Sequence, residues 1–432
     1  MNTQQEILAS LRSRAGELAA LSRQIWGRPE TAFEEVFAAR TLAGYLAEQG
    51  FSVRENIGGL STAFSASWGK GKPVVAFLGE YDALPGLSQK AGEAVRQAVV
   101  PGGAGHGCGH NLLGVGAAGA AVAVKEHLAA AGLPGTVVFF GCPAEEQGAG
   151  KAVMAGAGAF DGVDACFTWH PDTRNCVVGT PSLANIILRA RFRGKASHAA
   201  AAPELGRSAL DACELMNVGA NYLREHVDSA VRFHYAYTDC GGGSPNTVPA
   251  TAELLYYVRA SRIAQARETA ERLRSIARGA ALMTETKLTW RVECEMLDYI
   301  PNDALSRILD RALRDAGGPV FDEQDRRSAA AYGLAEEPLD GTVGPYVLSP
   351  VCRSVSTDVG NVSQLVPTAQ LFTACFAKST PFHSWQATAQ AAAPAAVKGM
   401  LAAAGALALA GAALMDDPVL LDGVKKEHGE RV

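Results

Sequence analysis

The segment PVVAFLG (residues 73–79) decides the fold class of this 432-residue chain. It is a short, continuous apolar run, and two similar runs follow, TVVFFGC (residues 136–142) and DACFTWH (residues 164–170). Between the first two lies the alanine-rich segment LLGVGAAGAAVAVKEHLAAAG (residues 112–132), which is typical of a helix that ends at a glycine. Strands that are apolar throughout and alternate with helices predict an α/β fold, with a largely parallel sheet that is covered on both faces.

The middle of the chain has a different pattern and predicts a second domain. NIILRARFRG (residues 185–194) and KLTWRVECEM (residues 287–296) alternate apolar and polar residues, as half-exposed strands do. Two helices are expected at about 207–225 and 264–281, and a hairpin is expected around the turn-rich GGGSPNTVP (residues 241–249). The resulting β-α-β-β-α-β order is the ferredoxin-like arrangement.

The apolar-strand pattern returns at AQLFTACFA (residues 369–377). The second domain is therefore expected to be inserted into a discontinuous first domain. We predict that the first domain, which carries the candidate ligands, takes residues 1–184 and 299–432, and that the inserted domain takes residues 185–298.

Composition limits the classes of protein that the chain can belong to. Hydrophobic residues make up 48% and charged residues 19%, which is typical of a globular protein of two domains. The formal net charge is −5 with both signs interspersed, so no basic surface for nucleic acid or for an anionic membrane is expected. The nine cysteines are odd in number and scattered, which predicts a reducing, cytoplasmic compartment.

Neither of two segments that resemble targeting or membrane segments has the required pattern. The N-terminal MNTQQEILASLRSRAGELAALSRQIW carries charges throughout and predicts an amphipathic helix, not a signal peptide. GMLAAAGALALAGAALM (residues 399–415) is slightly short for a membrane span and consists mainly of alanine and glycine. It therefore predicts a buried helix, and no membrane partner is expected.

Potential metal ligands or nucleophiles cluster after the buried strands. GHGCGHNLLG (residues 105–114) taken alone could be a disulfide corner, a reactive cysteine or part of a metal site. Glu145 and Glu146 follow the second apolar strand, His170 ends the third, and His383 follows the last. Because open α/β sheets build their sites at the carboxyl ends of parallel strands, this recurrence predicts one shared site.

Five of these side chains would form a mixed set of sulfur, nitrogen and oxygen donors: Cys108, His110, Glu146, His170 and His383. Such a set suffices for two divalent ions that share a ligand, and it suits Zn²⁺ or Mn²⁺. Two ions of this kind can activate a water molecule and polarise a carbonyl group. Glu145, adjacent to a ligand, is the predicted general base that passes the proton to the leaving amine.

Each of these residues also has an ordinary explanation. Cys108 could be a small buried hydrophobe, or a nucleophile that uses a histidine base. His170 could be a core histidine and His383 a loop histidine, while Glu145 and Glu146 could be a solvated pair. The roles of three further residues stay open at this point: His106, Glu80 and Asp82.

The spaced motifs GEYDALPG, GHGCGHNLLG, GCPAEE, TWHPD, GKASHAA, STDVG and TPFHSWQ resemble those of the metallopeptidase-type amidohydrolases. This family includes aminoacylase, glutamate-releasing carboxypeptidase and the auxin-conjugate hydrolases, and the resemblance covers nearly the whole chain. It implies a dinuclear metallohydrolase site with the five ligands above, with Cys108 as the bridging ligand and Glu145 as general base. The inserted domain would be a lid that also dimerises.

The resemblance also implies residues that bind substrate. His198 of GKASHAA and Asn246 of SPNTVP would reach the substrate carbonyl or carboxylate, and His198 would come from the neighbouring subunit. Arg259 is a candidate carboxylate clamp because its fork geometry suits that task, although it could also be a surface arginine. Glu80 stands where many relatives place a metal-binding histidine. Asn111 replaces an aspartate of the auxin-type relatives, which favours the branch that acts on aminobenzoyl-glutamate.

The expected activity is therefore metal-dependent hydrolysis of the amide bond of an N-acyl or N-aroyl amino acid. An aminobenzoyl-glutamate-like folate fragment is the first expected substrate. The alternatives are a dipeptidase or aminoacylase with another substrate, a cysteine-nucleophile hydrolase and a non-catalytic partner subunit. We expect a homodimer formed through the inserted domain, with a hetero-oligomer as the alternative, and a small-molecule substrate as the binding partner.

Overall fold

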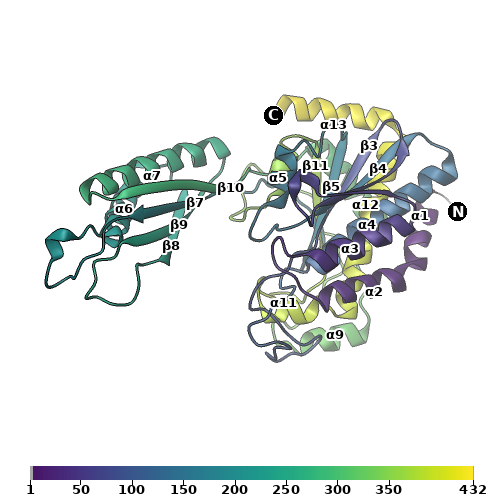
Figure 1. Cartoon of the computed structure of the whole chain (residues 1–432). Coiled ribbons are helices and arrows are strands. Elements are labelled where there is room, and N and C mark those ends of the chain that lie inside the picture. The colour runs from purple at the N-terminus through teal and green to yellow at the C-terminus, as the bar shows by residue number, and fades with distance from the viewer. Residues whose placement is uncertain (1–2, 432) are drawn as a thin grey trace. The chain divides into compact units, whose positions relative to one another are not determined.

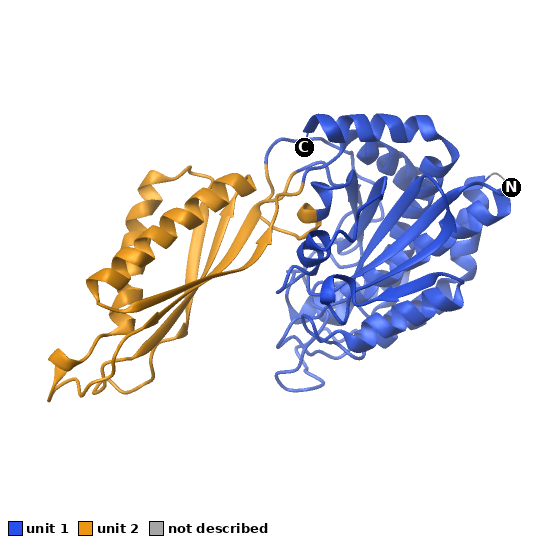
Figure 2. Ribbon diagram, turned by 45° about the horizontal axis from the view of Figure 1, so that its top comes forward, with its two compact units in different colours: residues 1–180, 300–351, 362–432 blue, residues 181–299, 352–361 orange. Residues whose placement is uncertain are grey.

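The computed structural model describes residues 3–431, which divide into two compact units (Figure 2). Unit 1 takes the described parts of residues 1–180, 300–351 and 362–432, and unit 2 takes residues 181–299 and 352–361. The segment 352–361, which the sequence assigned to the first domain, thus falls in unit 2. Hydrogen bonds to that unit explain the difference, since Leu183 N–H donates to the Val355 carbonyl.

Unit 1 is built on a seven-stranded sheet with the order β1-β2-β4-β3-β5-β11-β6 (Figure 1). Its four central strands are parallel: β4 (Gly135–Cys142), β3 (Val74–Glu80), β5 (Ala165–Asp172) and β11 (Thr368–Ala374). The other three strands pair in antiparallel fashion toward the edges: β1 (Ser52–Glu55), β2 (Phe64–Lys70) and β6 (Cys176–Val177). The predicted α/β fold with a mostly parallel sheet is confirmed.

Two long apolar helices, α4 (His110–Ala131) and α12 (Pro394–Asp416), pack on the central strands and on each other. By length and composition both could cross a membrane, but 78% and 72% of their most apolar stretches are buried inside the protein, as in core helices. The other helices outside the inserted segment are α1 (Thr3–Ser13), α2 (Ala15–Trp26), α3 (Val36–Glu48), α5 (Gly150–Gly156), α8 (Asp303–Ala316), α9 (Glu323–Ala330), α10 (Val359–Ser363), α11 (Trp385–Gln390) and α13 (Pro418–Arg431).

Unit 2 contains a four-stranded antiparallel sheet with the order β10-β7-β9-β8. Its elements follow one another as β7 (Ala184–Arg193), α6 (Ala209–Leu223), β8 (Arg232–Asp239), β9 (Thr251–Ala260), α7 (Ile263–Met283) and β10 (Lys287–Met296). The apolar residues of the strands form a single core with α6 and α7. The order of elements is the β-α-β-β-α-β order predicted from the sequence.

Glycine residues let α4 approach the carboxyl end of β3 very closely. A Cβ atom on Gly114 would lie 2.7 Å from the carbonyl oxygen of Glu80, the last residue of β3. A Cβ atom on Gly116 would lie 2.9 Å from the ring of Trp169 in β5. Because only glycine leaves room for this spacing, these positions bring His110, the first residue of α4, to the end of the sheet.

We predict that Gly114→Ala destabilises unit 1 by about 1–3 kcal/mol, because the added methyl group meets backbone that cannot yield. Gly44→Ala in α3 is the matched control, since a Cβ atom there meets nothing within 4 Å and alanine favours a helix. Urea unfolding of both variants measures the difference. Equal stability of the two variants would contradict the close packing of α4 on β3.

Candidate metal centre

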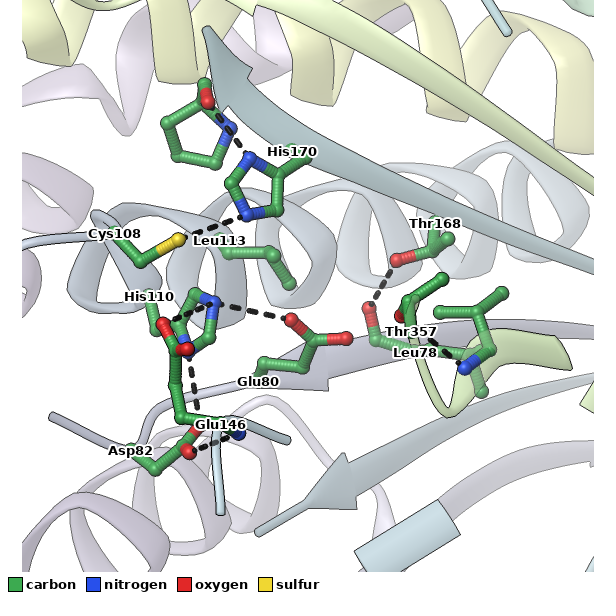
Figure 3. Close-up of polar contacts among 12 residues, drawn as sticks. Leu78, Glu80, Asp82, Cys108, His110, Leu113, Glu146, Thr168, His170 and Thr357 are labelled. Carbon is green, nitrogen blue, oxygen red and sulfur yellow. Dashed lines mark hydrogen bonds and ion pairs between the residues drawn. The ribbon is translucent and has the colours of Figure 1, made fainter. Parts of the chain in front are cut away.

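All five predicted ligands meet at the carboxyl ends of the central strands (Figure 3). Their donor atoms form two groups, Cys108 with His110 and His170, and Cys108 with Glu146 and His383; within each group the donor atoms lie within 4.8 Å of one another. A third group consists of Glu80, His110 and Glu145. Cys108 belongs to both of the first two groups, which is the position that a bridging ligand would occupy.

Cys108 and His170 form one side of the centre. The Cys108 Sγ atom lies 3.3 Å from Nε2 of His170, and Nδ1 of His170 lies 2.7 Å from the carbonyl oxygen of Pro171. Burial raises the pKa of the Cys108 thiol well above its usual value, and the nearby Glu146 carboxylate adds to this effect. A nucleophilic cysteine needs a lowered pKa, whereas a divalent cation would stabilise the thiolate here directly.

His110 is oriented by a carboxylate at its far side. Its Nδ1 atom lies 2.8 Å from Oδ1 of Asp82, so its Nε2 atom points into the centre (Figure 3). Burial opposes protonation of His110, but the charge and hydrogen bond of Asp82 raise its pKa well above the usual value. A carboxylate behind a histidine ligand fixes the tautomer and the ring orientation that metal binding requires.

Two buried polar atoms of the centre fit a bound cation. Among the described residues, Nε2 of His110 and Oε1 of Glu146 lack a hydrogen bond of acceptable geometry, although they lie 4.0 Å apart. Buried polar atoms without partners are rare in native proteins, and each calls for an explanation. A cation between such nitrogen, oxygen and sulfur donors supplies one.

Glu146 and His383 form the other side of the centre. His383 Nε2 lies 3.2 Å from Oε2 of Glu146, and this hydrogen bond raises the pKa of His383. The backbone N–H of Glu146 donates to Oδ2 of Asp82 over 2.9 Å, and that of His383 donates to the Gly107 carbonyl over 3.1 Å. The His383 side chain is 54% exposed while the other four ligands are buried or nearly so, so the centre faces solvent at His383.

Sequence reasoning left open, or missed, several residues that shape the centre. Asp82 holds both His110 and the backbone of Glu146, and its position just after a buried strand was the only available signal. Glu80 forms an ion pair with Lys151, with 2.6 Å between Oε1 and Nζ, and both side chains are buried. No sequence pattern pointed to Lys151.

His106 and Asn111 do not join the donor groups. Burial, together with the positive charge of His110, lowers the pKa of His106 to about 3, and the residue belongs to none of the three groups. The Asn111 amide donates to the Ser22 hydroxyl over 2.9 Å and to the Ala391 carbonyl over 3.1 Å. Asn111 therefore holds α4 against neighbouring segments.

The three predicted substrate-binding residues lie in unit 2, and two of them are neighbours. Asn246 Nδ2 lies 3.4 Å from Nε2 of His198. Nδ1 of His198 accepts the backbone N–H groups of Ala200 and Ala201, so a neutral ring carries its proton on Nε2. That nitrogen can then donate a hydrogen bond to a substrate oxygen.

Arg259 lies at the opposite end of β9 from Asn246. Its Nη1 atom donates to the Ser356 hydroxyl over 2.8 Å, and its side chain is half-buried beside Tyr257. At about 3.3 Å per residue, the strand from Thr251 to Arg259 spans about 26 Å. Within one copy of the chain, Arg259 and the His198–Asn246 pair therefore cannot hold the same small molecule.

Comparison with known proteins places this centre in a family. Residues 76–378 match peptidase family M20/M25/M40. The chain belongs to this family. It is 45% identical to one of the subunits of p-aminobenzoyl-glutamate hydrolase from Escherichia coli (strain K12), over 94% of this chain and 91% of that protein. It is 34% identical to Xaa-Arg dipeptidase of Mus musculus, over 96% and 89% of the two chains.

A solved structure of the same family shares the fold. The YXEP protein of Bacillus subtilis, described as a dinuclear metal binding peptidase from the M20 family, has a TM-score of 0.60. The identity is 19%, over 94% of this chain and 99% of that one. The resemblance to metallopeptidase-type amidohydrolases is confirmed, and this M20 chain is a metal-dependent amide hydrolase.

Glu35 is a buried carboxyl group that supports the turn before Glu145. Its Oε1 atom accepts the backbone N–H of Ala144 over 2.8 Å, and its Oε2 atom accepts the Thr62 hydroxyl over 3.0 Å. Ala144 has a φ of 58°, a left-handed conformation that is uncommon for a residue with a side chain. Burial and the negative charge of Asp82 raise the pKa of Glu35 to about 7.

This raised pKa predicts a pH-dependent stability. In the folded protein Glu35 keeps its proton up to about pH 7, whereas an unfolded chain loses it near the ordinary value of 4.5. The folded state thus binds more protons in this window, and the contribution of Glu35 to stability is lost as the pH rises. Glu35→Gln stays neutral, so it should gain up to about 3 kcal/mol relative to wild type between about pH 5 and pH 8.

Urea unfolding at several pH values, with a chelator present to exclude bound cations, measures this gain. Glu34→Gln is the matched control, because the exposed neighbour should show no such trend. A difference between Glu35→Gln and wild type that does not change with pH would refute the raised pKa.

Proposed function

We propose that the chain hydrolyses the amide bond of an N-acyl or N-aroyl amino acid and uses two divalent ions, Mn²⁺ or Zn²⁺. The observation that carries this proposal is the meeting of five donor side chains in two groups that share Cys108. Mixed sulfur, nitrogen and oxygen donors suit these two metals.

p-Aminobenzoyl-glutamate is the first proposed substrate, because the Escherichia coli relative at 45% identity is named for its hydrolysis. A dipeptide with a C-terminal arginine is the second candidate, because Xaa-Arg dipeptidase is 34% identical over nearly the whole chain. Both substrates have an amide bond next to a residue with a free carboxylate. Comparing kcat/KM on the two, with N-acyl amino acids alongside, decides between them.

When bound, the two ions would lower the pKa of a water molecule and polarise the amide carbonyl. Cys108 would lie between them, with His110 and His170 on one side and Glu146 and His383 on the other. Asp82 keeps the Nε2 lone pair of His110 directed inward, because it occupies Nδ1.

Glu145 is the proposed general base. It directly precedes the ligand Glu146, and one of its carboxylate oxygens lies within 4.8 Å of donor atoms of Glu80 and His110. From this position a carboxylate can take a proton from the attacking water and deliver it to the leaving nitrogen. The C–O bond forms as the C–N bond breaks, and the products are a carboxylic acid and an amine.

Glu145→Gln should lower kcat about 10²–10⁴-fold, because the amide cannot take the proton, and should leave the bound metal unchanged. Release of p-aminobenzoate by the metal-loaded protein, together with the metal content, gives both readouts. Glu48→Gln on the exposed surface of α3 is the control and should have wild-type turnover. Unchanged turnover in Glu145→Gln would remove Glu145 from this role.

Removal of the metal separates this function from a cysteine-nucleophile hydrolase. A chelator should abolish turnover, and Mn²⁺ or Zn²⁺ added back should restore it, since the proposed reaction depends on both ions. Turnover that persists in the metal-free protein would favour Cys108 as a nucleophile. If the metal-loaded chain turns over none of the substrates, the alternative of a non-catalytic partner subunit gains support.

We propose that the chain forms a homodimer through unit 2, within the reducing cytoplasm. β8 is an edge strand whose Tyr235 and Tyr237 are exposed, and α6 exposes Leu215, Val218 and Tyr222 on successive turns. The Tyr237 hydroxyl contacts Asn217 and thereby links β8 to α6. An open strand edge beside apolar side chains favours cover by another chain. A hetero-oligomer remains the alternative, because the Escherichia coli relative is named as one subunit of its enzyme.

The dimer would let His198 of one copy serve the site of the other, and a mixing experiment tests this. Glu145→Gln and His198→Ala should each be inactive alone. Refolded or co-expressed together, they should recover up to about a quarter of wild-type activity, because mixed dimers contain one intact site. If mixed dimers form, as shown by native mass spectrometry, and remain inactive, His198 does not act across the interface.

A further inference from the structure

We propose that Glu80, held by the buried Lys151, is a further donor to the ion at His110. This inference rests on the proposed metal-dependent function. Oε1 of Glu80 lies 2.6 Å from the Lys151 ammonium, while Oε2 lies 3.3 Å from Nε2 of His110 (Figure 3). The second oxygen therefore faces the nitrogen that Asp82 leaves available for a metal.

The distance fits two donors on a single ion. Nitrogen and oxygen ligands lie about 2.0–2.2 Å from Zn²⁺, so two neighbouring ligands of one ion are about 3.0–3.5 Å apart. The 3.3 Å between His110 Nε2 and Glu80 Oε2 falls in this range. The 4.0 Å between His110 Nε2 and Glu146 Oε1 does not, which agrees with Glu146 belonging to the other group.

Lys151 determines which oxygen of Glu80 is presented. It lies in the first turn of α5, its side chain is completely buried, and its ammonium engages Oε1. A buried lysine–carboxylate pair is not by itself more stabilising than apolar residues of similar size. Its presence next to the ligands is therefore better explained by the centre than by the stability of the fold.

The charges of the centre also agree with this assignment. The negative groups are five when Cys108 is a thiolate: Glu80, Asp82, Glu145, Glu146 and Cys108. Lys151 offsets one of them, and the remaining four equal the charge of two divalent ions. An additional carboxylate oxygen also makes the His110 side of the centre more favourable for Mn²⁺ relative to Zn²⁺.

Titration of the metal-free protein with Mn²⁺ alone, followed by calorimetry and by metal analysis after dialysis, tests the inference. Wild type should bind two ions. Glu80→Gln should bind one as wild type does and the other about 10–100-fold more weakly. Glu145→Gln removes the same charge from the same group without removing the proposed donor, so it is the matched control and should bind both ions almost as wild type does.

The double variant Glu80→Gln with Lys151→Met keeps the net charge of the pair and should show the same weakened second ion. Glu80→His with Lys151→Met should recover most of the affinity, because it restores a donor. If Glu80→Gln binds both ions as Glu145→Gln does, Glu80 is only a structural partner of Lys151, and the inference is overturned. If wild type itself fails to bind two ions, the proposed dinuclear function fails instead.

Discussion

The hydrogen bond between Asp82 and His110 is the interaction on which the rest of the centre depends. It joins the end of β3 to the first residue of α4, and the same carboxylate accepts the backbone N–H of Glu146 from the segment after β4. This arrangement is possible because Gly114 lets α4 lie almost against the carbonyl oxygen of Glu80. One carboxylate and one missing side chain thus bring together ligands from three distant stretches of sequence.

Burial gives this arrangement its chemical character. Without a cation the Cys108 thiol has a raised pKa, and Nε2 of His110 and Oε1 of Glu146 have no suitable partner among the described residues. Each of these groups gains from a divalent ion, which stabilises a thiolate and accepts the two lone pairs. The half-exposed His383 marks the side at which a substrate amide could approach the ions.

The sequence predicted the parts of the molecule whose pattern is local. β3, β4, β5 and β11 were predicted because they are apolar throughout, and the ligands because they recur at strand ends. β1 and β6 were missed, because SVRE is mostly exposed and β6 has only two residues. The roles of Lys151 and Glu35 were missed too, since a buried partner far away in sequence leaves no local pattern. The assignment of residues 352–361 depends likewise on tertiary hydrogen bonds.

Anomalous X-ray diffraction from crystals grown with Mn²⁺ or Zn²⁺ tests the central claim most directly. Data collected at the absorption edge of the metal locate each ion independently of any assumed ligand. The account predicts two peaks a few ångströms apart, both in contact with Cys108, one also with His110 and His170, and the other with Glu146 and His383. A single peak, or peaks that Cys108 does not contact, would contradict it.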